Sequence, residues 1–566
     1  MAARGGCPEN PVIYQIYPRS FRDTSGTGEG DLRGVLEGLD HVASLGVDAV
    51  WLSPFYRSPM CDGGYDVADH YAVDPRFGTL HDFDAVLSRA HDLGLRVMVD
   101  LVLNHTSDAH EWFAKSLVRE EGYEDTYVWA DAKPDGSPPT NWISFFGTPG
   151  WRWYPQRGQY NLTKFLPCQP CLNHHDPRVG ERLEAITRFW RDRGVDGFRY
   201  DAITSFFHDT GLRDDPVASE SDAALTPGPP SNPFTRQAHV HDVLPNDCAA
   251  FSGRLREMAG PDAFLLGEVN NGARSVEVLR SFTEEGRLDA CYTVDLVERG
   301  PNGPVIAEMI ERLDGHGGFA WWLSCHDQPR HVSAFGDGSA RDAKMFAALL
   351  CALPGPLLLF QGEELGQPQA DLKRAQLHDP VDRMYWPEPM GRDGARAPMA
   401  WDDSLPRAGF SGATPWLPVA RGEDGAVRQQ SDAPDSVLSF YRKALALRRD
   451  LGLADGTVTL SPAPGQAILA RVETAGAALL VAVNTGDEAV SQAVQFLVGE
   501  GRTLVDSETV TVSPGETQTV ALGYETYQVQ QDVTFPVVVA SEDDEAERVV
   551  EVYAAAAAHL DVTITG

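Results

Sequence analysis

Residues 31–52 read DLRGVLEGLDHVASLGVDAVWL and hold a helix, a stop and a strand in that order. The apolar residues recur every three or four positions, which is the spacing of one face of an amphipathic helix: Leu32, Val35, Leu36, Leu39, Val42 and Leu45. Asp31 stands where an N-cap is expected, and Gly46 stands where a glycine ends a helix. The apolar run 47–52 then predicts a buried strand.

The same unit returns twice, and this repetition decides the fold class. A helical face over 80–93 ends at Gly94 before the strand 95–102, and a third copy ends at Gly194 before 195–200. Alternating helices and strands predict parallel βα units. Five more strand candidates bring the total to eight: 13–17, 264–269, 290–294, 319–325 and 356–360. We therefore predict an α/β protein built on a closed (β/α)8 TIM barrel.

Two stretches interrupt this rhythm and indicate further domains. Residues 106–176 are rich in Trp, Tyr, Pro, Gly and Asn without a helical period, which predicts a small domain inserted after the third strand. Short apolar runs beyond 456 predict a C-terminal β-sandwich domain. A chain of 566 residues is long enough for this division: a barrel over 1–105 and 177–455, an inserted domain over 106–176 and a sandwich over 456–566.

Charge and cysteine content narrow the possible partners. The formal net charge of -35 repels phosphate backbones and anionic membranes, whereas a neutral sugar is compatible with it, although the charge also serves solubility. No apolar run reaches the length of about 18 residues that a membrane span needs, and the N-terminus shows no secretory pattern. The eight cysteines are scattered, so we predict reduced thiols and a cytoplasmic location.

One cysteine pair has the spacing of metal ligands. Cys168 and Cys171 form a CxxC, and His174 and His175 follow closely. Thiolate and imidazole groups bind zinc, but a structural site of this kind usually has a second CxxC, which the sequence lacks. We therefore favour Cys171 as a small buried residue and predict no structural zinc.

Polar residues follow four of the predicted strands, where a parallel barrel places its active site. They lie in DLVLNH (100–105), GFRYD (197–201), GEV (267–269) and CHDQ (325–328). Cleavage of a glycosidic bond with retention needs a carboxylate nucleophile and a second carboxyl group as acid and base. Asp201 and Glu268 lie at the ends of neighbouring strands, so we expect the separation of about 5–5.5 Å that this mechanism requires. Each acid alone could be a cap or an ion-pair partner, but the joint pattern favours catalysis.

Further sequence blocks carry a family resemblance. In chain order they are VIYQIYPRSF (12–21), GGYDV (63–67), QGEELG (361–366) and GRDGARAPM (391–399). With the strand-end residues, they make nearly the whole chain resemble the α-amylase family of glycoside hydrolases (glycoside hydrolase family 13). Within that family, the chain is most similar to the α-glucosidase and oligo-1,6-glucosidase branch.

The resemblance implies a role for each matching residue. Asp201 would be the nucleophile and Glu268 the acid/base, while Asp327 would hold sugar hydroxyls and stabilise the positive transition state. Substrate would also be bound by six further residues: Tyr65, Asp66, His105, Arg199, His326 and Arg392. Arg199 would keep the nucleophile ionised, the two histidines would bond sugar hydroxyls, and the tyrosine would form a stacking wall. Arg392 would pair with Asp66 and close the pocket, which makes the enzyme exo-acting on short substrates.

Three positions bear on specificity and metal binding. The residue after the nucleophile tends to be Val in α-1,6-specific relatives and Ala or Thr in α-1,4-specific ones, so Ala202 predicts an α-1,4 preference. The loop from Asp23 to Asp31 corresponds to a calcium loop in many relatives. Here Ser25 and Thr27 replace two of its usual oxygen donors, so we predict weak or no calcium binding and no cofactor.

The leading hypothesis is a retaining α-glucosidase that releases terminal non-reducing glucose from maltose-like or sucrose-like substrates through a covalent glucosyl-enzyme. A transglucosidase, a sucrose-acting enzyme or an oligo-1,6-glucosidase on the same scaffold is the alternative. The sequence lacks the RLDRD block of sucrose isomerases, which argues against that one variant. A non-catalytic carbohydrate-binding scaffold is the remaining reading, and the presence of all three acids argues against it.

Overall fold

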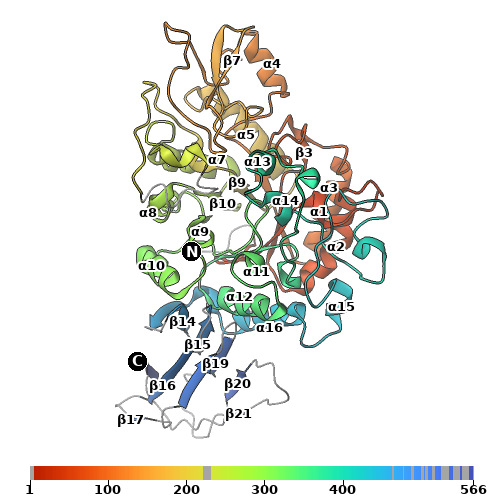
Figure 1. Cartoon of the computed structure of the whole chain (residues 1–566), viewed down its shortest axis with the longest axis vertical. Helices are drawn as coiled ribbons and strands as arrows, with labels where there is room; N and C mark the ends of the chain where they lie inside the picture. The colour runs from red at the N-terminus through yellow and green to blue at the C-terminus, as the bar shows by residue number, and fades with distance from the viewer. Residues whose placement is uncertain are drawn as a thin grey trace.

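A curled parallel sheet forms the centre of the computed structural model, which describes residues 6–220, 231–461, 465–475 and 477–485, and beyond them the C-terminal strands named below (Figure 1). The sheet has seven strands in the order β11-β10-β9-β5-β2-β1-β12. Their bounds are β1 Val12–Ile16, β2 Ala49–Leu52, β5 Arg96–Leu101, β9 Gly197–Tyr200, β10 Phe264–Glu268, β11 Ala290–Tyr292 and β12 Leu357–Phe360. Every pairing within it is parallel, as predicted from the alternating helices and strands.

Residues 319–321 lie between the two edge strands of this sheet. Phe319 forms a parallel bridge with Cys291 in β11, and Trp321 forms another with Leu357 in β12. The segment thus contributes single bridges where the sequence predicted a strand over 319–325.

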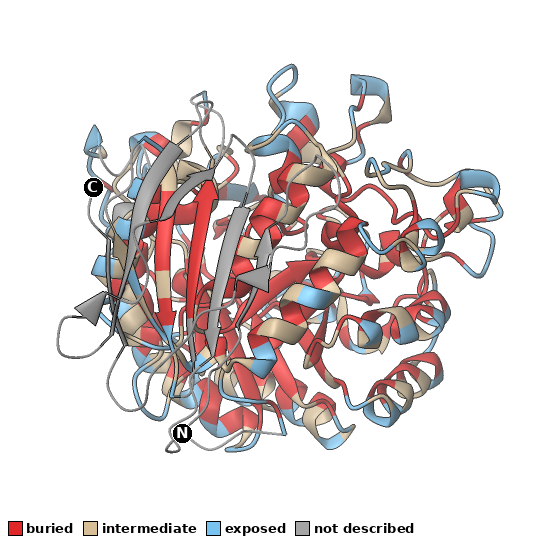
Figure 2. Ribbon diagram, turned by 90° about the horizontal axis from the view of Figure 1, so that it is seen from below, coloured by how far each residue is buried: buried red, intermediate tan, exposed pale blue. Residues whose placement is uncertain are grey.

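Helices follow the strands along the chain and cover the sheet. The longer ones are α2 Leu32–Ser44, α3 Leu80–Asp92, α5 Pro177–Asp192, α7 Pro245–Ala259, α8 Ser275–Phe282, α10 Gly303–Leu313, α12 Ala340–Ala352 and α16 Val437–Asp450. Shorter ones occupy the connections: α1 Pro18–Phe21, α9 Asp295–Arg299, α11 His331–Ala334, α13 Pro380–Met384, α14 Arg392–Ala395 and α15 Val427–Ser431. Figure 2 shows buried residues on the inner faces of these helices and exposed residues on their outer faces. The division of each helix into a buried face and an exposed face explains the amphipathic periodicity of the sequence.

The predicted ends of α2 are confirmed. The Asp31 side chain accepts a hydrogen bond from the amide of Gly34, which satisfies one of the free N–H groups at the start of the helix. The helix ends at Ser44, and Gly46 follows with φ 78°, a left-handed conformation that costs glycine little. Helix α3 begins with a reciprocal capping box between Thr79 and Asp82.

Alternate residues of the parallel strands face two different cores. One set, which includes Ile13, Trp51, Met98 and Leu266, packs together inside the curled sheet. The other set, such as Tyr14 and Val50 on the same strands, packs against the helices. Because both faces are buried, the strands read as nearly continuous apolar runs, and polar side chains are left for the strand ends.

Two groups of antiparallel strands extend beyond the central sheet. After β5 and two short strands β3 Tyr56–Arg57 and β4 Asp69–Val73, the chain forms α4 Glu111–Leu117 and a sheet of β6 Trp129–Ala130, β8 Gln159–Leu162 and β7 Trp151–Tyr154. The C-terminal part forms one sheet of β13 Thr457–Ser461, β14 Ala467–Glu473, β15 Ala477–Asn484, β19 Thr517–Gly523, β20 Phe535–Val539 and β21 Val549–Val550. A second sheet joins β16 Val490–Val498 to β17 Arg502–Thr503, β18 Glu508–Val512 and β22 Leu560–Ile564.

The cysteines correct one prediction. Cys61 and Cys168 form a disulfide across 107 positions of sequence, so the expectation that all eight thiols are reduced is wrong. The physical reason is tertiary: the loop between β3 and β4 meets the inserted segment, and the Cα atoms of the two cysteines lie 6.9 Å apart. The other six cysteines are free and buried. Among the described helices, none has the length and apolar character needed to cross a membrane.

Candidate active site

One buried guanidinium organises the strand ends on one side of the site. Arg199 on β9 has a fully buried side chain, and its Nη1 donates to Asp201 at 2.7 Å and to Asp100 at 2.8 Å. Its Nη2 donates to Glu268, at the end of β10, at 2.7 Å. Three carboxylates therefore share one cation, and the planar fork of arginine can serve all three at once because its donors point in fixed directions.

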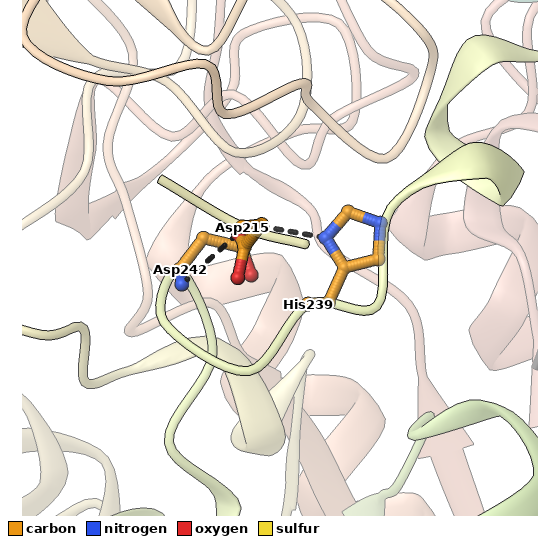
Figure 3. Close-up of side chains that lie close together, drawn as sticks. All are labelled: Asp215, His239 and Asp242. Atoms are coloured by element: carbon orange, nitrogen blue, oxygen red, sulfur yellow. Dashed lines mark hydrogen bonds and ion pairs between the residues drawn. The ribbon is translucent and has the colours of Figure 1, made fainter. Parts of the chain in front are cut away.

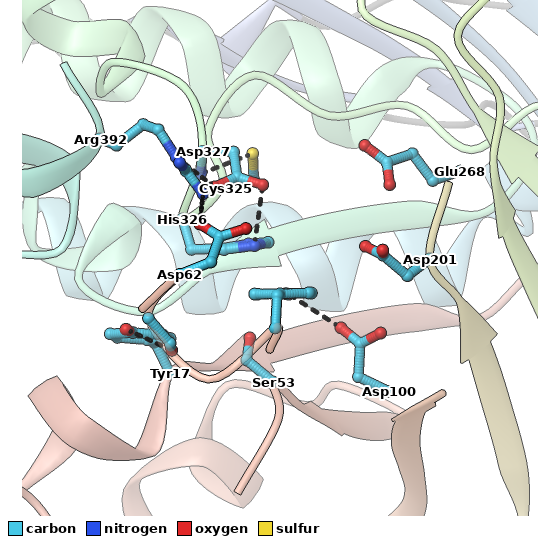
Figure 4. A network of polar contacts seen from close by, with 12 residues as sticks. Tyr17, Ser53, Asp62, Asp100, Asp201, Glu268, Cys325, His326, Asp327 and Arg392 are labelled. Carbon is cyan, nitrogen blue, oxygen red and sulfur yellow. Dashed lines mark hydrogen bonds and ion pairs between the residues drawn. The ribbon is translucent and has the colours of Figure 1, made fainter. Parts of the chain in front are cut away.

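Asp201 and Glu268 lie next to one another, as Figure 4 shows. Each is held by a different nitrogen of Arg199, so the two acids are as close as neighbouring nitrogens of one guanidinium allow. The amide of Ala202 donates to Glu268 at 3.0 Å, and Asn270 donates to the other carboxylate oxygen at 3.2 Å. Both acids line the same pocket.

Asp327 faces them from the other side of the pocket (Figure 4). It accepts hydrogen bonds from Arg392 Nε at 3.0 Å and from Arg396 Nη2 at 2.6 Å, and its other oxygen lies 3.0 Å from His326 Nε2. Burial acts to raise the pKa of Asp327, but His326 and the two guanidiniums outweigh it and hold that pKa well below its ordinary value. Asp327 is therefore a permanent anion at neutral pH.

The expected pair of Arg392 with Asp66 is wrong. Arg392 Nη2 instead donates to Asp62 at 2.8 Å, and Asp62 lines the pocket. Asp66 is fully buried, and its oxygens accept from Ser58 Oγ and from the amides of Cys61 and Asp62. The loop thus turns around Asp66, because its carboxylate satisfies three donors at once, and directs the acid four residues earlier into the pocket. Burial raises the pKa of Asp66 to about 6.

Aromatic rings and an amide complete the inner wall. The rings of Tyr65 and His326 stack with centroids 4.9 Å apart, and the Tyr65 hydroxyl donates to Asp100 at 2.9 Å. Gln169 donates to Asp62 at 2.9 Å, and its Nε2 lies 3.0 Å from His105 Nε2. Burial lowers the pKa of His105 to about 4, so this histidine is neutral at neutral pH.

The structure thus brings most of the predicted residues to one pocket. Those that line it are Tyr65, His105, Asp201, Glu268, His326, Asp327 and Arg392, while Arg199 lies beneath the acids and Asp66 lies behind the loop. Three residues of the site were not among the predicted substrate-binding residues: Asp62, Gln169 and Arg396. Asp62 stands one position before the GGYD block and Arg396 within GRDGAR, so both lay in or beside motifs that had already been singled out.

Burial raises the pKa of Asp201 well above its ordinary range, with the charges of Glu268 and Asp100 acting in the same direction and Arg199 opposing them. Arg199 does lower the pKa of Asp201, in the direction predicted, but burial and the two neighbouring carboxylates outweigh its effect. With all three acids ionised, the group around the guanidinium carries two surplus negative charges in a buried place. Burial and this surplus of negative charge are the physical reasons why the pKa values of Asp201 and Asp100 are raised.

The outer pocket is lined by four phenylalanines and by a loop around His239 that hydrogen bonds hold in place. The rings are Phe145, Phe146, Phe165 and Phe234. In Figure 3, Asp215 and Asp242 lie against His239, whose ring also stacks on Phe234. Asp215 accepts the amides of residues 240 and 241, and His239 Nδ1 contacts Asp242 at 2.8 Å. The three ligand atoms lie within 4.8 Å of one another, but these contacts already engage them, so we interpret the cluster as an anchor for the loop.

The two candidate metal loops are also internally bonded. Asp23 accepts hydrogen bonds from the amides of Gly26 and Gly28, and Asp31 accepts from those of Thr24 and Ser25. The CxxC does not gather four ligands: Cys168 is in the disulfide, and Cys171 accepts the amide of residue 164. His174 and His175 contact the carbonyls of residues 103 and 208.

Comparison with known proteins agrees with this geometry. The family model described as "Alpha amylase, catalytic domain" matches residues 15–456. A probable α-glucosidase of Rhizobium meliloti (strain 1021) is 45% identical over 491 residues, which cover 85% of this chain and 87% of that protein. An oligo-1,6-glucosidase of Heyndrickxia coagulans is 34% identical over 516 residues, covering 85% and 92%.

Solved structures show the same architecture. An α-glucosyl transfer enzyme superposes with a TM-score of 0.85 at 40% identity, over 92% of this chain and 99% of that one. The trehalulose synthase of Pseudomonas mesoacidophila MX-45 superposes with a TM-score of 0.79 at 29% identity, over 91% and 99%. These matches, together with the acids at the strand ends, identify the protein as a glycoside hydrolase. More narrowly, the chain belongs to the α-amylase family, and it is an enzyme of the α-glucosidase type.

Proposed function

We propose that the protein is a retaining α-glucosidase that removes terminal non-reducing glucose from short α-glucosides. The observation that carries the proposal is the shared guanidinium of Arg199, which sets Asp201 and Glu268 side by side. Two carboxyl groups in close proximity are the arrangement of a retaining enzyme, because a wider gap is needed when water attacks directly. The permanent anion Asp327 on the opposite wall suits stabilisation of a positively charged sugar.

The reaction follows from these positions. The Asp201 carboxylate attacks the anomeric carbon, and Glu268 gives its proton to the departing glycosidic oxygen, which leaves a β-glucosyl ester on Asp201. Glu268, now a carboxylate, then takes a proton from water, and the resulting oxygen attacks the anomeric carbon. The ester breaks, α-glucose is released, and both acids return to their starting states.

A chain of ion pairs at one end of the pocket supports an exo-acting enzyme. Asp62, Arg392 and Asp327 form a chain of ion pairs at one end, with Asp62 bonded to Arg392 at 2.8 Å and Arg392 to Asp327 at 3.0 Å. We assign to Asp62 and Arg392 the far hydroxyls of a single terminal glucose, the role first predicted for Asp66. Carboxylates and guanidiniums suit this task since charged partners make strong hydrogen bonds to neutral hydroxyls.

Ala202 supports a preference for the α-1,4 linkage. It lines the pocket beside both catalytic acids, with φ 45° and its amide bonded to Glu268. A β-branched residue would narrow the acceptor side, and its bulk also fits poorly in a left-handed conformation. Transfer of glucose to a sugar acceptor is a second candidate activity, because a solved relative with 40% identity is named an α-glucosyl transfer enzyme and the glucosyl-enzyme is common to both outcomes.

The proposal includes the domain division and the location. We take 319–321 as the eighth position of a (β/α)8 barrel over 1–105 and 177–455, with 106–176 as an inserted domain and 456–566 as a C-terminal β-sandwich. The bridges to β11 and β12 support the first of these. Six free buried cysteines support a cytoplasmic enzyme, and the Cys61–Cys168 disulfide is the exception among the eight.

The test compares release of glucose from maltose, isomaltose and sucrose by the wild type, Asp201→Asn and Ala202→Val, with analysis of all products. We expect fast cleavage of maltose, slow cleavage of isomaltose, and a fall of at least about a thousandfold for Asp201→Asn. Ala202→Val is expected to lower the ratio of maltose to isomaltose cleavage. Preference of the wild type for isomaltose would reject the linkage assignment alone, and full activity of Asp201→Asn would reject the mechanism.

A further inference from the structure

A disulfide joins the two segments that carry Asp62 and Gln169. Cys61 precedes Asp62 in the loop between β3 and β4, and Cys168 precedes Gln169 in the inserted segment. Both cysteines are only half-buried, in contrast to the six buried free thiols. A small reductant can therefore reach this bond more readily than it can reach any of the six free thiols.

The covalent bond runs beside a hydrogen bond between the next residues. Gln169 Nε2 donates to Asp62 Oδ2 at 2.9 Å, so the disulfide and this hydrogen bond close a small ring of four residues. Ordering a loop costs conformational entropy. A covalent link at this point therefore holds Asp62 and Gln169 next to each other with little further loss of entropy.

This ring of four residues positions the end of the site that we assign to the terminal glucose. Asp62 Oδ1 accepts from Arg392, which also donates to Asp327, and Gln169 lies against His105. Cys61 and Cys168 pack against an apolar cluster that includes Phe146, Phe165 and Leu166, and the two phenylalanines line the pocket. A change at the disulfide thus reaches the pocket both through Asp62 and through its aromatic wall.

We propose that the Cys61–Cys168 disulfide is a redox-sensitive clamp on the glucose pocket, and that the oxidised enzyme binds α-glucosides more tightly than the reduced enzyme. The inference rests on the proposed function, whose pocket it regulates. In a reducing cytoplasm a lasting disulfide is unusual, and those that occur are commonly transient and redox-sensing. Cys61 and Cys168 would then act as positioning residues, since they touch Asp62 and Gln169 rather than the substrate.

The switch is ordinary thiol–disulfide exchange with a dithiol. A thiolate of the dithiol attacks one sulfur of the bond and releases the other cysteine as a thiolate, which takes up a proton. The second thiol of the reductant then displaces the first cysteine and closes a cyclic disulfide. Two electrons and two protons pass to the protein, and an oxidising disulfide reverses the reaction.

The experiment measures kcat and KM for maltose with the full chain before and after dithiothreitol, with the thiols counted by mass spectrometry after alkylation. We expect two new thiols, a rise in KM of about five- to tenfold and a change in kcat of less than about twofold, since loss of uniform binding moves KM. Reoxidation should restore the original KM. A merely stabilising bond would leave KM unchanged below the melting temperature.

Two variants sharpen this result. The double variant Cys61→Ser, Cys168→Ser should show the high KM of the reduced wild type and no response to dithiothreitol. Cys171→Ser, the matched control from the same CxxC, should keep the response of the wild type. A shift of KM in the double variant on treatment, or an unchanged KM in wild type with two counted new thiols, would overturn the clamp. The wild-type measurement decides the matter even if the double variant fails to fold.

Hydrogen exchange separates failure of the clamp from failure of the proposed function. Reduction should speed amide exchange in 61–66 and 164–172 and leave α3 unchanged, whether or not maltose is a substrate. If neither redox form cleaves an α-glucoside, the proposed function fails, and faster exchange in those two segments still supports a redox-dependent pocket wall. Equal exchange in both redox forms would reject the clamp.

Discussion

Replacement of Asp62 by asparagine tests the assignment of the sugar-binding acid most directly. The substitution keeps the size of the side chain and removes the charge that Arg392 meets at 2.8 Å. Arg392 retains Asp327 and Asp379 as partners, at 3.0 and 3.2 Å, so the buried guanidinium is not left alone. The fold should therefore survive the change, and the loss should fall on substrate binding.

The expected magnitude follows from one charged hydrogen bond. Hydrogen bonds to charged groups contribute about 1.5–3 kcal/mol. Since about 1.4 kcal/mol corresponds to a factor of ten, kcat/KM for maltose should fall about 10- to 150-fold in Asp62→Asn. Steady-state assays of glucose release measure this fall, and thermal unfolding followed by circular dichroism should show a melting temperature close to that of the wild type.

Asp66→Asn is the matched control, because it lies in the same loop and carries the opposite expectation. Its carboxylate accepts three hydrogen bonds inside the loop, from Ser58 and two amides. An amide oxygen can replace only some of them, and its NH2 group would face donors, so stability should fall by about 1–3 kcal/mol. A small change in kcat/KM for Asp62→Asn, together with a large loss of kcat/KM and no loss of stability for Asp66→Asn, would refute the role of Asp62. It would then favour Asp66 as the acid that binds the sugar.

Three further outcomes are expected. Arg199→Lys should lower kcat at least about a hundredfold and destabilise the fold by about 3–5 kcal/mol, because a lysine cannot pair with three buried carboxylates at once; retention of half the activity would contradict this. His105 has a pKa near 4 in the folded protein against 6.5 ordinarily, so the folded state binds fewer protons than the unfolded state between those values, and stability is lost as the pH falls. Between pH 7 and pH 5, denaturant unfolding should therefore show the wild type losing about 2 kcal/mol more than His105→Gln, and equal losses would refute the shift. Calcium and a chelator should change the melting temperature by less than about 1 °C, since the amides around Asp23 and Asp31 already occupy those carboxylates, and a clear rise with calcium would overturn that view.

The sequence determined by itself the features that depend on local periodicity and on strand order. Residues 31–52 specify an amphipathic helix, its caps and a buried strand, and both predicted ends of α2 are present in the structure. Because parallel strands expose their carboxyl ends at one edge, the sequence alone places the acids at the ends of β9 and β10 together. The prediction of two acids in one pocket needed no more than that rule.

Only the tertiary structure decided which side chains of the loops face inward. Asp62 and Asp66 are four residues apart in one loop, and the sequence does not say which acid the backbone amides will surround. The pairing of Cys61 with Cys168 could not be predicted from the sequence either, because it depends on contact between segments 107 positions apart. Periodic elements are specified by interactions between near neighbours, whereas loop side chains are oriented by partners that are distant in the chain, and for that reason only the folded structure reveals them.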